Sequence, residues 1–170
     1  MRVRSLWMAA AGIALAAFAA GQTKTTGTIE CNKPDPNYKI DIGDQEGHAF
    51  VISKVACTWT KGMEIEGTQT KDGESVGMAD AKGMKAQEHG YHVSNMANGD
   101  KIFVRYQGTG TMGKDGKPVS SKGTWSYSGG TGKLKGIKGK GTYEGKPSGD
   151  DKMTFQIEGE YTLPAAKPAK

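Results

Sequence analysis

Long apolar runs, cysteine and helical periodicity are all scarce in this chain of 170 residues. After residue 21, no stretch is long and apolar enough to cross a bilayer as a helix, and none repeats its apolar residues every three or four positions. Charge is nearly balanced, because 23 Lys and Arg are interspersed with 18 Asp and Glu, and this does not indicate binding to nucleic acid. These absences predict a single domain in which β-structure dominates.

The one long apolar run stands at the start of the chain. Arg2 and Arg4 precede the apolar residues 6–20, a run too short to span a bilayer, and small residues follow at its end. This order is typical of a secretory signal peptide, cleaved before Ala20 or before Gln22. No cysteine closely follows the run, so no membrane anchor is expected once the signal is removed. We expect an exported protein, either periplasmic or secreted.

Composition divides the chain into a signal peptide (1–21), one folded domain (22–162) and a tail (163–170) that is expected to be disordered. Removing the signal takes away two arginines and leaves 21 Lys and Arg against 18 Asp and Glu. Most of this excess lies between residues 133 and 152, in the repeated lysines Lys133, Lys135, Lys138 and Lys140. A solvated face is the ordinary interpretation of such lysines, and an anionic partner such as a surface polysaccharide is the alternative.

The two cysteines, Cys31 and Cys57, both fall in the exported part of the chain. An oxidising compartment favours a disulfide between them, and neither has the basic or ligand-rich neighbours of a catalytic or metal-binding thiol. Closing the intervening loop of 57 − 31 = 26 residues is expected to stabilise the fold by about 3–4 kcal/mol.

Alternating apolar and polar residues predict about eight short strands, which favour an antiparallel β-barrel or sandwich. The strongest hairpin signal is Asn98-Gly99 before the strand at 101–107, and Asp72-Gly73 predicts a second tight turn. Residues 79–88 have the weakest pattern and are expected to form a loop or one helical turn. The expected strands lie at residues 27–31, 38–42, 49–60, 63–70, 74–79, 90–96, 101–107, 119–128 and 152–161.

Glycine is concentrated in residues 123–143, among aromatic and apolar side chains. Residues 129–143 (GGTGKLKGIKGKGTY) resemble the Gly-Gly-x-Gly-x-Phe-x-Gly-x-x-Gly segment of the allene oxide cyclase and dirigent-like β-barrels, with Leu134 at the usual Phe position. The resemblance implies an eight-stranded antiparallel barrel, calycin-like in shape, with a central cavity and with this segment as a structural corner. No catalytic residue of that family is matched here by a local motif. The glycines expected to be structural are Gly129, Gly130, Gly132, Gly136, Gly139 and Gly141.

Three motifs resemble catalytic or metal sites, but their setting does not support these functions. The Gly-x-Ser-x-Gly pattern around Ser75, with Asp80, His89 and Asp100 as conceivable partners, requires a strand-to-helix turn in a large α/β sheet. The phosphate-loop pattern at 108–114 has no following helix and no Ser or Thr after its lysine. His89 and His92 would point to opposite faces of a strand, so they could not share a metal ion. We therefore expect no catalytic residues, no metal and no cofactor.

A barrel cavity would be lined by inward aromatic residues. The residues expected to bind a ligand are Trp59, Tyr106, Trp125, Tyr127 and His48. The leading hypothesis is an exported, non-catalytic β-barrel that holds a small apolar molecule. The alternatives are an allene oxide cyclase-like isomerase or cyclase and a surface interaction module with a basic face. A cavity with perturbed ionisation beside Tyr106 or His48 would favour the enzyme, and a packed interior would exclude both enzyme and carrier.

Overall fold

The computed structural model describes residues 22–149 and 151–165. The expected signal peptide, residues 1–21, lies outside the described residues, as does the end of the expected tail. Within the described part, strands dominate, and the one helical segment is the short 3₁₀ helix η1 (Gly132–Leu134). None of the described helical structure has the length and hydropathy that crossing a membrane requires.

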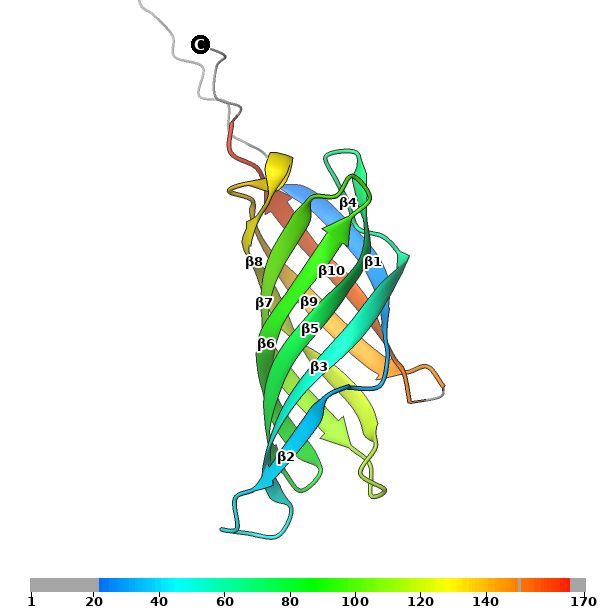
Figure 1. Cartoon of the computed structure of the whole chain (residues 1–170), viewed down its shortest axis with the longest axis vertical. Helices are drawn as coiled ribbons and strands as arrows, with labels where there is room; N and C mark the ends of the chain where they lie inside the picture. Colours follow the sequence, from blue (N-terminus) through cyan, green and yellow to red (C-terminus); the bar gives the residue numbers. More distant parts are fainter. Residues whose placement is uncertain (1–21, 150, 166–170) are drawn as a thin grey trace, which may run out of the picture.

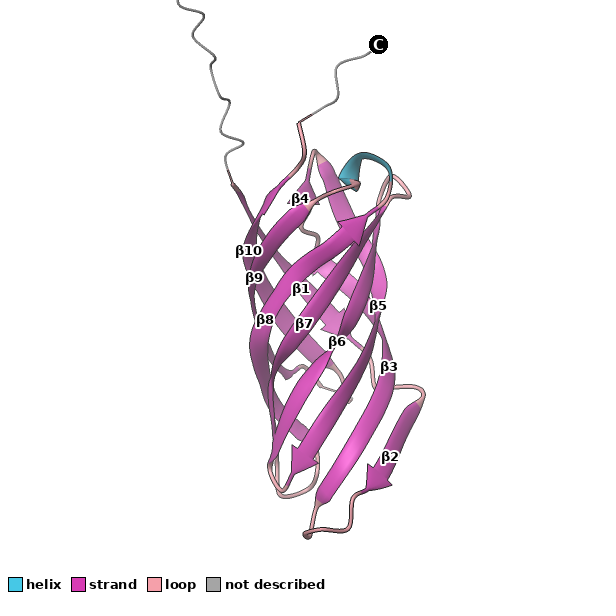
Figure 2. Ribbon diagram, turned by 90° about the vertical axis from the view of Figure 1, so that its left-hand side faces the viewer, coloured by secondary structure: helices cyan, strands magenta, loops and turns pink. Residues whose placement is uncertain are grey.

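The strands form one antiparallel sheet that closes on itself, so the predicted barrel is confirmed (Figures 1 and 2). The sheet has the order β2-β3-β1-β10-β9-β8-β7-β6-β5-β4, and the further pairing of β3 with β5 closes it. Two short strands, β2 and β4, are additions to the eight-stranded wall. The bounds are β1 Thr23–Cys31, β2 Asn37–Asp41, β3 His48–Lys61, β4 Glu64–Ile65, β5 Thr68–Lys82, β6 Lys85–Met96, β7 Lys101–Met112, β8 Pro118–Gly130, β9 Lys138–Pro147 and β10 Met153–Thr162.

The turn predicted at Asp72-Gly73 was wrong. Strand β5 runs without a break through Gly73, which lies opposite Cys57 on β3. The chain turns earlier, where Glu66 and Gly67 both have positive φ (52° and 70°). The weak segment 79–88 is also not a loop, because it holds the end of β5 and the start of β6. Asn98-Gly99 does join β6 to β7, as predicted.

The glycine-rich segment contains both a turn and a strand. Gly132 and Gly136 lie in the turn that includes η1 and have positive φ (51° and 84°), so this part is a corner as expected. Gly139 and Gly141 instead lie inside β9, a strand that the sequence pattern did not reveal. Alternation was hidden there because glycine occupies inward positions where an apolar side chain was expected.

Inward aromatic rings explain the glycines within strands. Each ring lies over a glycine directly opposite on the neighbouring strand and over a second glycine one strand further on. A side chain at the glycine would collide with the ring or with backbone; a Cβ on Gly141, for example, would lie 1.9 Å from the carbonyl oxygen of Glu158. The three rows are Tyr106–Gly90–Gly77, Tyr143–Gly123–Gly108 and Trp125–Gly141–Gly159.

One end of the barrel is filled by apolar side chains. Leu134 from η1 and the neighbouring Ile137 are buried there and cover this end, where η1 is visible at the top of Figure 1. Leu163, just beyond β10, packs against the same group of residues, so the chain remains in contact with the barrel at the start of the expected tail. The buried residues of this group are Met63, Ile65, Met96, Ile102, Trp125, Tyr127, Leu134, Ile137, Tyr143 and Tyr161.

The expected disulfide between Cys31 and Cys57 is present. The two cysteines lie directly opposite each other at the end of the short β1–β3 pairing, which starts at Thr28 and Lys61. Beyond this point β2 replaces β1 as the neighbour of β3 and forms an edge at the other end of the barrel (Figure 2). The disulfide therefore ties the wall together where β1 leaves β3.

Candidate functional site: the barrel cavity

A cavity of about 860 Å³ occupies the barrel away from the filled end. This volume lies in the range of pockets that hold small organic molecules. It exists because inward positions in this half carry small residues, such as Ser75 on β5 and Ser121 on β8. Much of its wall is apolar and is contributed by Ile29, Val51, Val55, Val104, Met112, Met153, Phe155 and Ile157.

Four of the five residues expected to bind a ligand line this cavity. Trp125 and Tyr127 lie at its inner end, where they are buried and their ring centroids are 4.8 Å apart. Trp59 and Tyr106 are half-buried and line its wall. Burial raises the pKa of Tyr106 to about 12, and the charge of Glu88 acts in the same direction.

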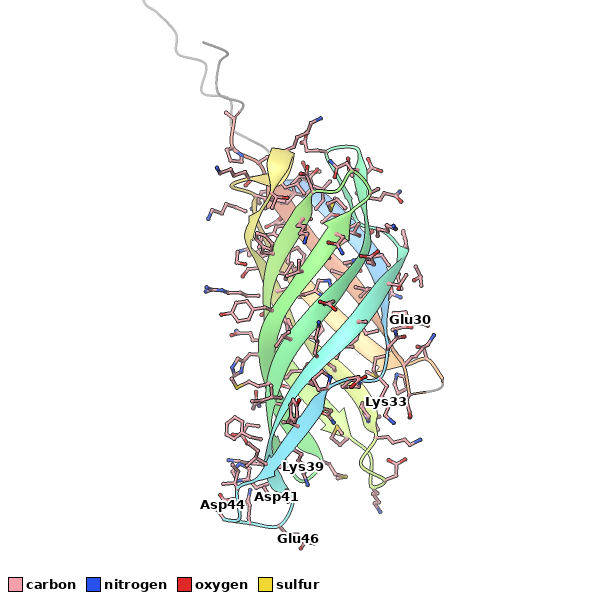
Figure 3. All side chains as sticks on the ribbon, in the orientation of Figure 1. Glu30, Lys33, Lys39, Asp41, Asp44 and Glu46 are labelled. Atoms are coloured by element: carbon pink, nitrogen blue, oxygen red, sulfur yellow. A yellow bond between two sulfur atoms is a disulfide. The ribbon has the colours of Figure 1, made fainter. Side chains whose placement is uncertain are left out.

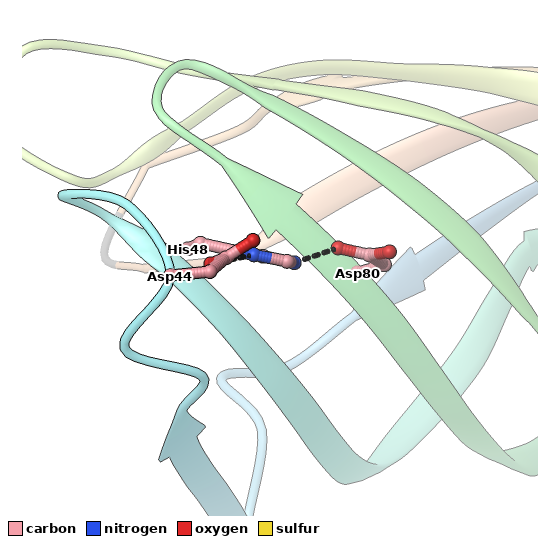
Figure 4. Close-up of polar contacts among 3 residues, drawn as sticks. All are labelled: Asp44, His48 and Asp80. Carbon is pink, nitrogen blue, oxygen red and sulfur yellow. Dashed lines mark hydrogen bonds and ion pairs between the residues drawn. The ribbon is translucent and has the colours of Figure 1, made fainter.

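His48, the fifth expected residue, is a correction, because it does not line the cavity. It is the first residue of β3 and lies opposite Lys82, the last residue of β5. Its ring is held between two carboxylates, with Nδ1 against Asp44 and Nε2 2.8 Å from Asp80 (Figure 4). The hydrogen bond with His48 lowers the pKa of Asp44. The ring therefore joins the β2–β3 loop to β5.

Polar side chains form one chain of hydrogen bonds across the cavity wall. Trp59 Nε1 donates to Ser94 Oγ (3.2 Å), which is 2.9 Å from His92 Nε2, and His92 Nδ1 is 2.8 Å from Ser75 Oγ. Burial lowers the pKa of His92 to about 4, so the ring is neutral at pH 7. Sequence reasoning considered other partners for Ser75 because it placed a turn at Asp72-Gly73, within β5, and so missed the register that sets Ser75 opposite His92.

Glu88 supplies the carboxylate of the cavity. Its Oε1 accepts hydrogen bonds from Ser121 Oγ and from Tyr143 OH, the latter at 2.9 Å. Burial and the charge of Glu88 raise the pKa of Tyr143, so its hydroxyl remains a donor. Tyr106 and Tyr143 lie nearly perpendicular, with centroids 6.1 Å apart. The sequence pattern did not single out Glu88, since alternation alone does not show which polar residues line a cavity.

Charged pairs surround the open end of the cavity. Lys33 and Lys117 lie 3.5 and 3.6 Å from the carboxylate of Asp151, and Lys152 lies 2.8 Å from Glu30. Lys33 and Glu30 are labelled in Figure 3. These lysines line the cavity entrance, whereas the lysines of residues 133–140 are exposed around η1 and β9 at the other end. Among the described residues, no three His, Cys, Asp or Glu side chains are arranged to hold a metal ion.

The outer surface near the open end carries apolar side chains. Tyr38 on β2, Ile52 on β3 and Met78 on β5 lie directly opposite one another across the three strands and are exposed. These residues point outward, whereas neighbours on β2 and β3 such as Asn37, Val51 and Ser53 point inward and line the cavity.

No known family model and no curated protein sequence matches this chain. Solved structures do match. A conserved protein of unknown function from Rhodopseudomonas palustris has a TM-score of 0.52 at 9% identity, covering 82% of this chain and 98% of that one. A pterocarpan synthase dirigent protein has a TM-score of 0.49 at 12% identity, covering 94% and 100%. A pyocyanin demethylase has a TM-score of 0.44 at 17% identity, covering 79% and 98%.

The resemblance is one of fold. The closed barrel that the glycine-rich segment predicted is confirmed, and a dirigent protein is among the structures that it resembles. At these identities, the chemistry of the chain has to be argued from its own cavity residues.

Proposed function

We propose that this protein is exported and that its barrel binds one small, largely apolar molecule in the cavity without transforming it. The main support is the cavity of about 860 Å³. Side chains fill the barrel at one end only, and Trp125 and Tyr127 line the cavity next to that end. Eight-stranded barrels either fill their interior or hold one small ligand, and this interior is not filled. The disulfide and the signal-like first residues support export.

Native mass spectrometry of the protein purified from its own exported fraction tests this proposal. We expect a mass above that of the cleaved chain by one small organic molecule, which is released on unfolding. Recovery of unmodified chain alone, together with failure of the purified barrel to bind any aromatic probe of naphthalene size, would contradict it. A chain recovered with residues 1–21 still attached would contradict export.

A second candidate is an isomerase or cyclase of the allene oxide cyclase type. The observation that favours it is the group of ionisable side chains on the cavity wall, where burial and the charge of Glu88 raise the pKa of Tyr106 and burial lowers that of His92. Such groups could donate or accept protons at a bound molecule.

The molecule recovered from the exported fraction separates the two functions. We expect it to be unchanged after prolonged incubation with fresh protein, as judged by liquid chromatography and mass spectrometry. Conversion to a product, lost in the Glu88→Gln variant, would instead support the enzyme. The outward-facing Glu158→Gln variant serves as the control for the loss of one carboxylate.

A further inference from the structure

The cavity wall carries a half-buried carboxylate, that of Glu88. Glu88 lies on β6, with Gly108 opposite it on β7 and Ala79 opposite it on β5, so its immediate inward neighbours are small. Both of its hydrogen bonds, from Ser121 and Tyr143, go to Oε1. Within residues 22–149 and 151–165, none of the ion pairs involves Glu88.

A carboxylate facing an apolar space is costly unless a positive charge or hydrogen-bond donors compensate it. Ser121 and Tyr143 provide donors to one oxygen, Oε1. Glu88 is part of the cavity wall, so its second oxygen, Oε2, remains as an acceptor for part of a ligand.

The side chains around Glu88 suit a cation. Tyr143 reaches it through its hydroxyl, and the rings of Tyr106 and Trp125 line the same cavity, so a ligand with its positive group at Glu88 would have aromatic rings nearby. His92, another ionisable side chain of the cavity wall, is neutral at pH 7. The lysines that line the cavity stand at its entrance, beside Asp151 and Glu30.

We infer that the cavity selects an organic cation, such as a protonated amine on a flat apolar body, with the positive group at Glu88 and the apolar body against the aromatic wall. This inference rests on the proposed ligand-binding function and specifies its ligand class. An anionic ligand of the same shape would be repelled by Glu88, and a neutral one could donate a hydrogen bond to the carboxylate but would lack the attraction between opposite charges.

Three probes with the same ring test the inference by titration calorimetry at neutral pH: naphthylmethylammonium, naphthylmethanol and naphthoate. We expect the ammonium probe to bind about tenfold more tightly than the alcohol, because its positive charge is attracted to Glu88 beyond the hydrogen bond that either probe can donate. Naphthoate should bind most weakly. In Glu88→Gln the ammonium probe should lose this advantage and bind no more tightly than the alcohol.

Glu158→Gln is the matched control, since it removes a carboxylate from the exposed face of β10 and should leave all three affinities unchanged. Equal binding of ammonium and alcohol to the unaltered protein would overturn the inference while leaving the ligand-binding function intact. Tighter binding of naphthoate would overturn it as well. Binding of none of the probes would contradict the proposed function itself. Thermal melting of Glu88→Gln verifies that the variant is folded.

Discussion

The two ends of the barrel are built from the same strands but have different interiors. Along β7, the inward residues change from Ile102 at the filled end, through Tyr106, to Gly108 and Gly110 towards the open end. The filled end is further closed by Leu134 from η1. β7 pairs with β6 and β8 through both halves, so the cavity in this part of the barrel depends on inward side-chain volume and on the covering turn.

The largest expected effect compares two glycines that lie beneath aromatic rings. In Gly141→Ala, the new Cβ would lie 1.9 Å from the Glu158 carbonyl oxygen and 2.7 Å from the Trp125 ring, so backbone must move in a packed region. We expect this variant not to fold, as judged by soluble yield and circular dichroism.

Gly77→Ala is its counterpart in the open half. Its Cβ would meet the Tyr106 hydroxyl at 2.1 Å, but the next atoms lie at 3.3 Å or more, and the ring can move into the cavity. A loss in unfolding free energy of about 1 kcal/mol is expected from urea titration. If both variants were equally unstable, the open half would be as tightly packed as the filled one.

Reduction of the disulfide should cost about 3–4 kcal/mol of unfolding free energy, because Cys31 and Cys57 close a loop of sequence separation 26. The melting temperature should drop by several degrees in differential scanning calorimetry. The double variant Cys31→Ala/Cys57→Ala should match the reduced protein. An unchanged melting temperature after verified reduction would show that the β1–β3 pairing does not need this covalent link.

Leu134→Ala should destabilise the filled end by about 3 kcal/mol, since it removes buried methyl groups and leaves a hole under η1. Val55→Ala, a truncation on the cavity wall, should cost only about 1 kcal/mol because that side chain already faces open space. Urea unfolding measures both. Equal costs would contradict the contrast between the two ends.

His92, in the open half, should make the free energy of unfolding depend on pH. Its pKa is about 4 in the folded protein against 6.5 for an ordinary histidine, so the unfolded chain takes up the proton first as the pH falls. The contribution of neutral His92 to stability is therefore fully present above pH 6.5. It declines between pH 6.5 and 4, by up to about 3 kcal/mol, with no further loss from this group below pH 4.

The variant His92→Gln should flatten the dependence of unfolding free energy on pH in this window. His89→Gln, on the exposed face of the same strand, should leave the dependence as it is. A slope that persists in His92→Gln would assign it to other groups.

Strong local signals predicted much of the wall and little of the site. Asn98-Gly99 marked a hairpin correctly, and alternation located β3 and β10 within a few residues. Asp72-Gly73 has the same turn chemistry but lies within β5, because ladder hydrogen bonds on both sides outweigh the local preference. The aromatic residues Trp59 and Tyr106 line the cavity, whereas His48 has the outward parity of its strand.

By itself, the sequence determined the fold class and the corner at Gly132 and Gly136, because alternation and turn chemistry act over short distances. It also determined the disulfide, because the chain has only two cysteines to pair. Only the tertiary structure decided that Glu88 meets Tyr143 and that Ser75 meets His92, because these contacts depend on register across several strands. Register also decided what the glycines of β9 do, since a glycine such as Gly141 makes room for a ring that belongs to another strand.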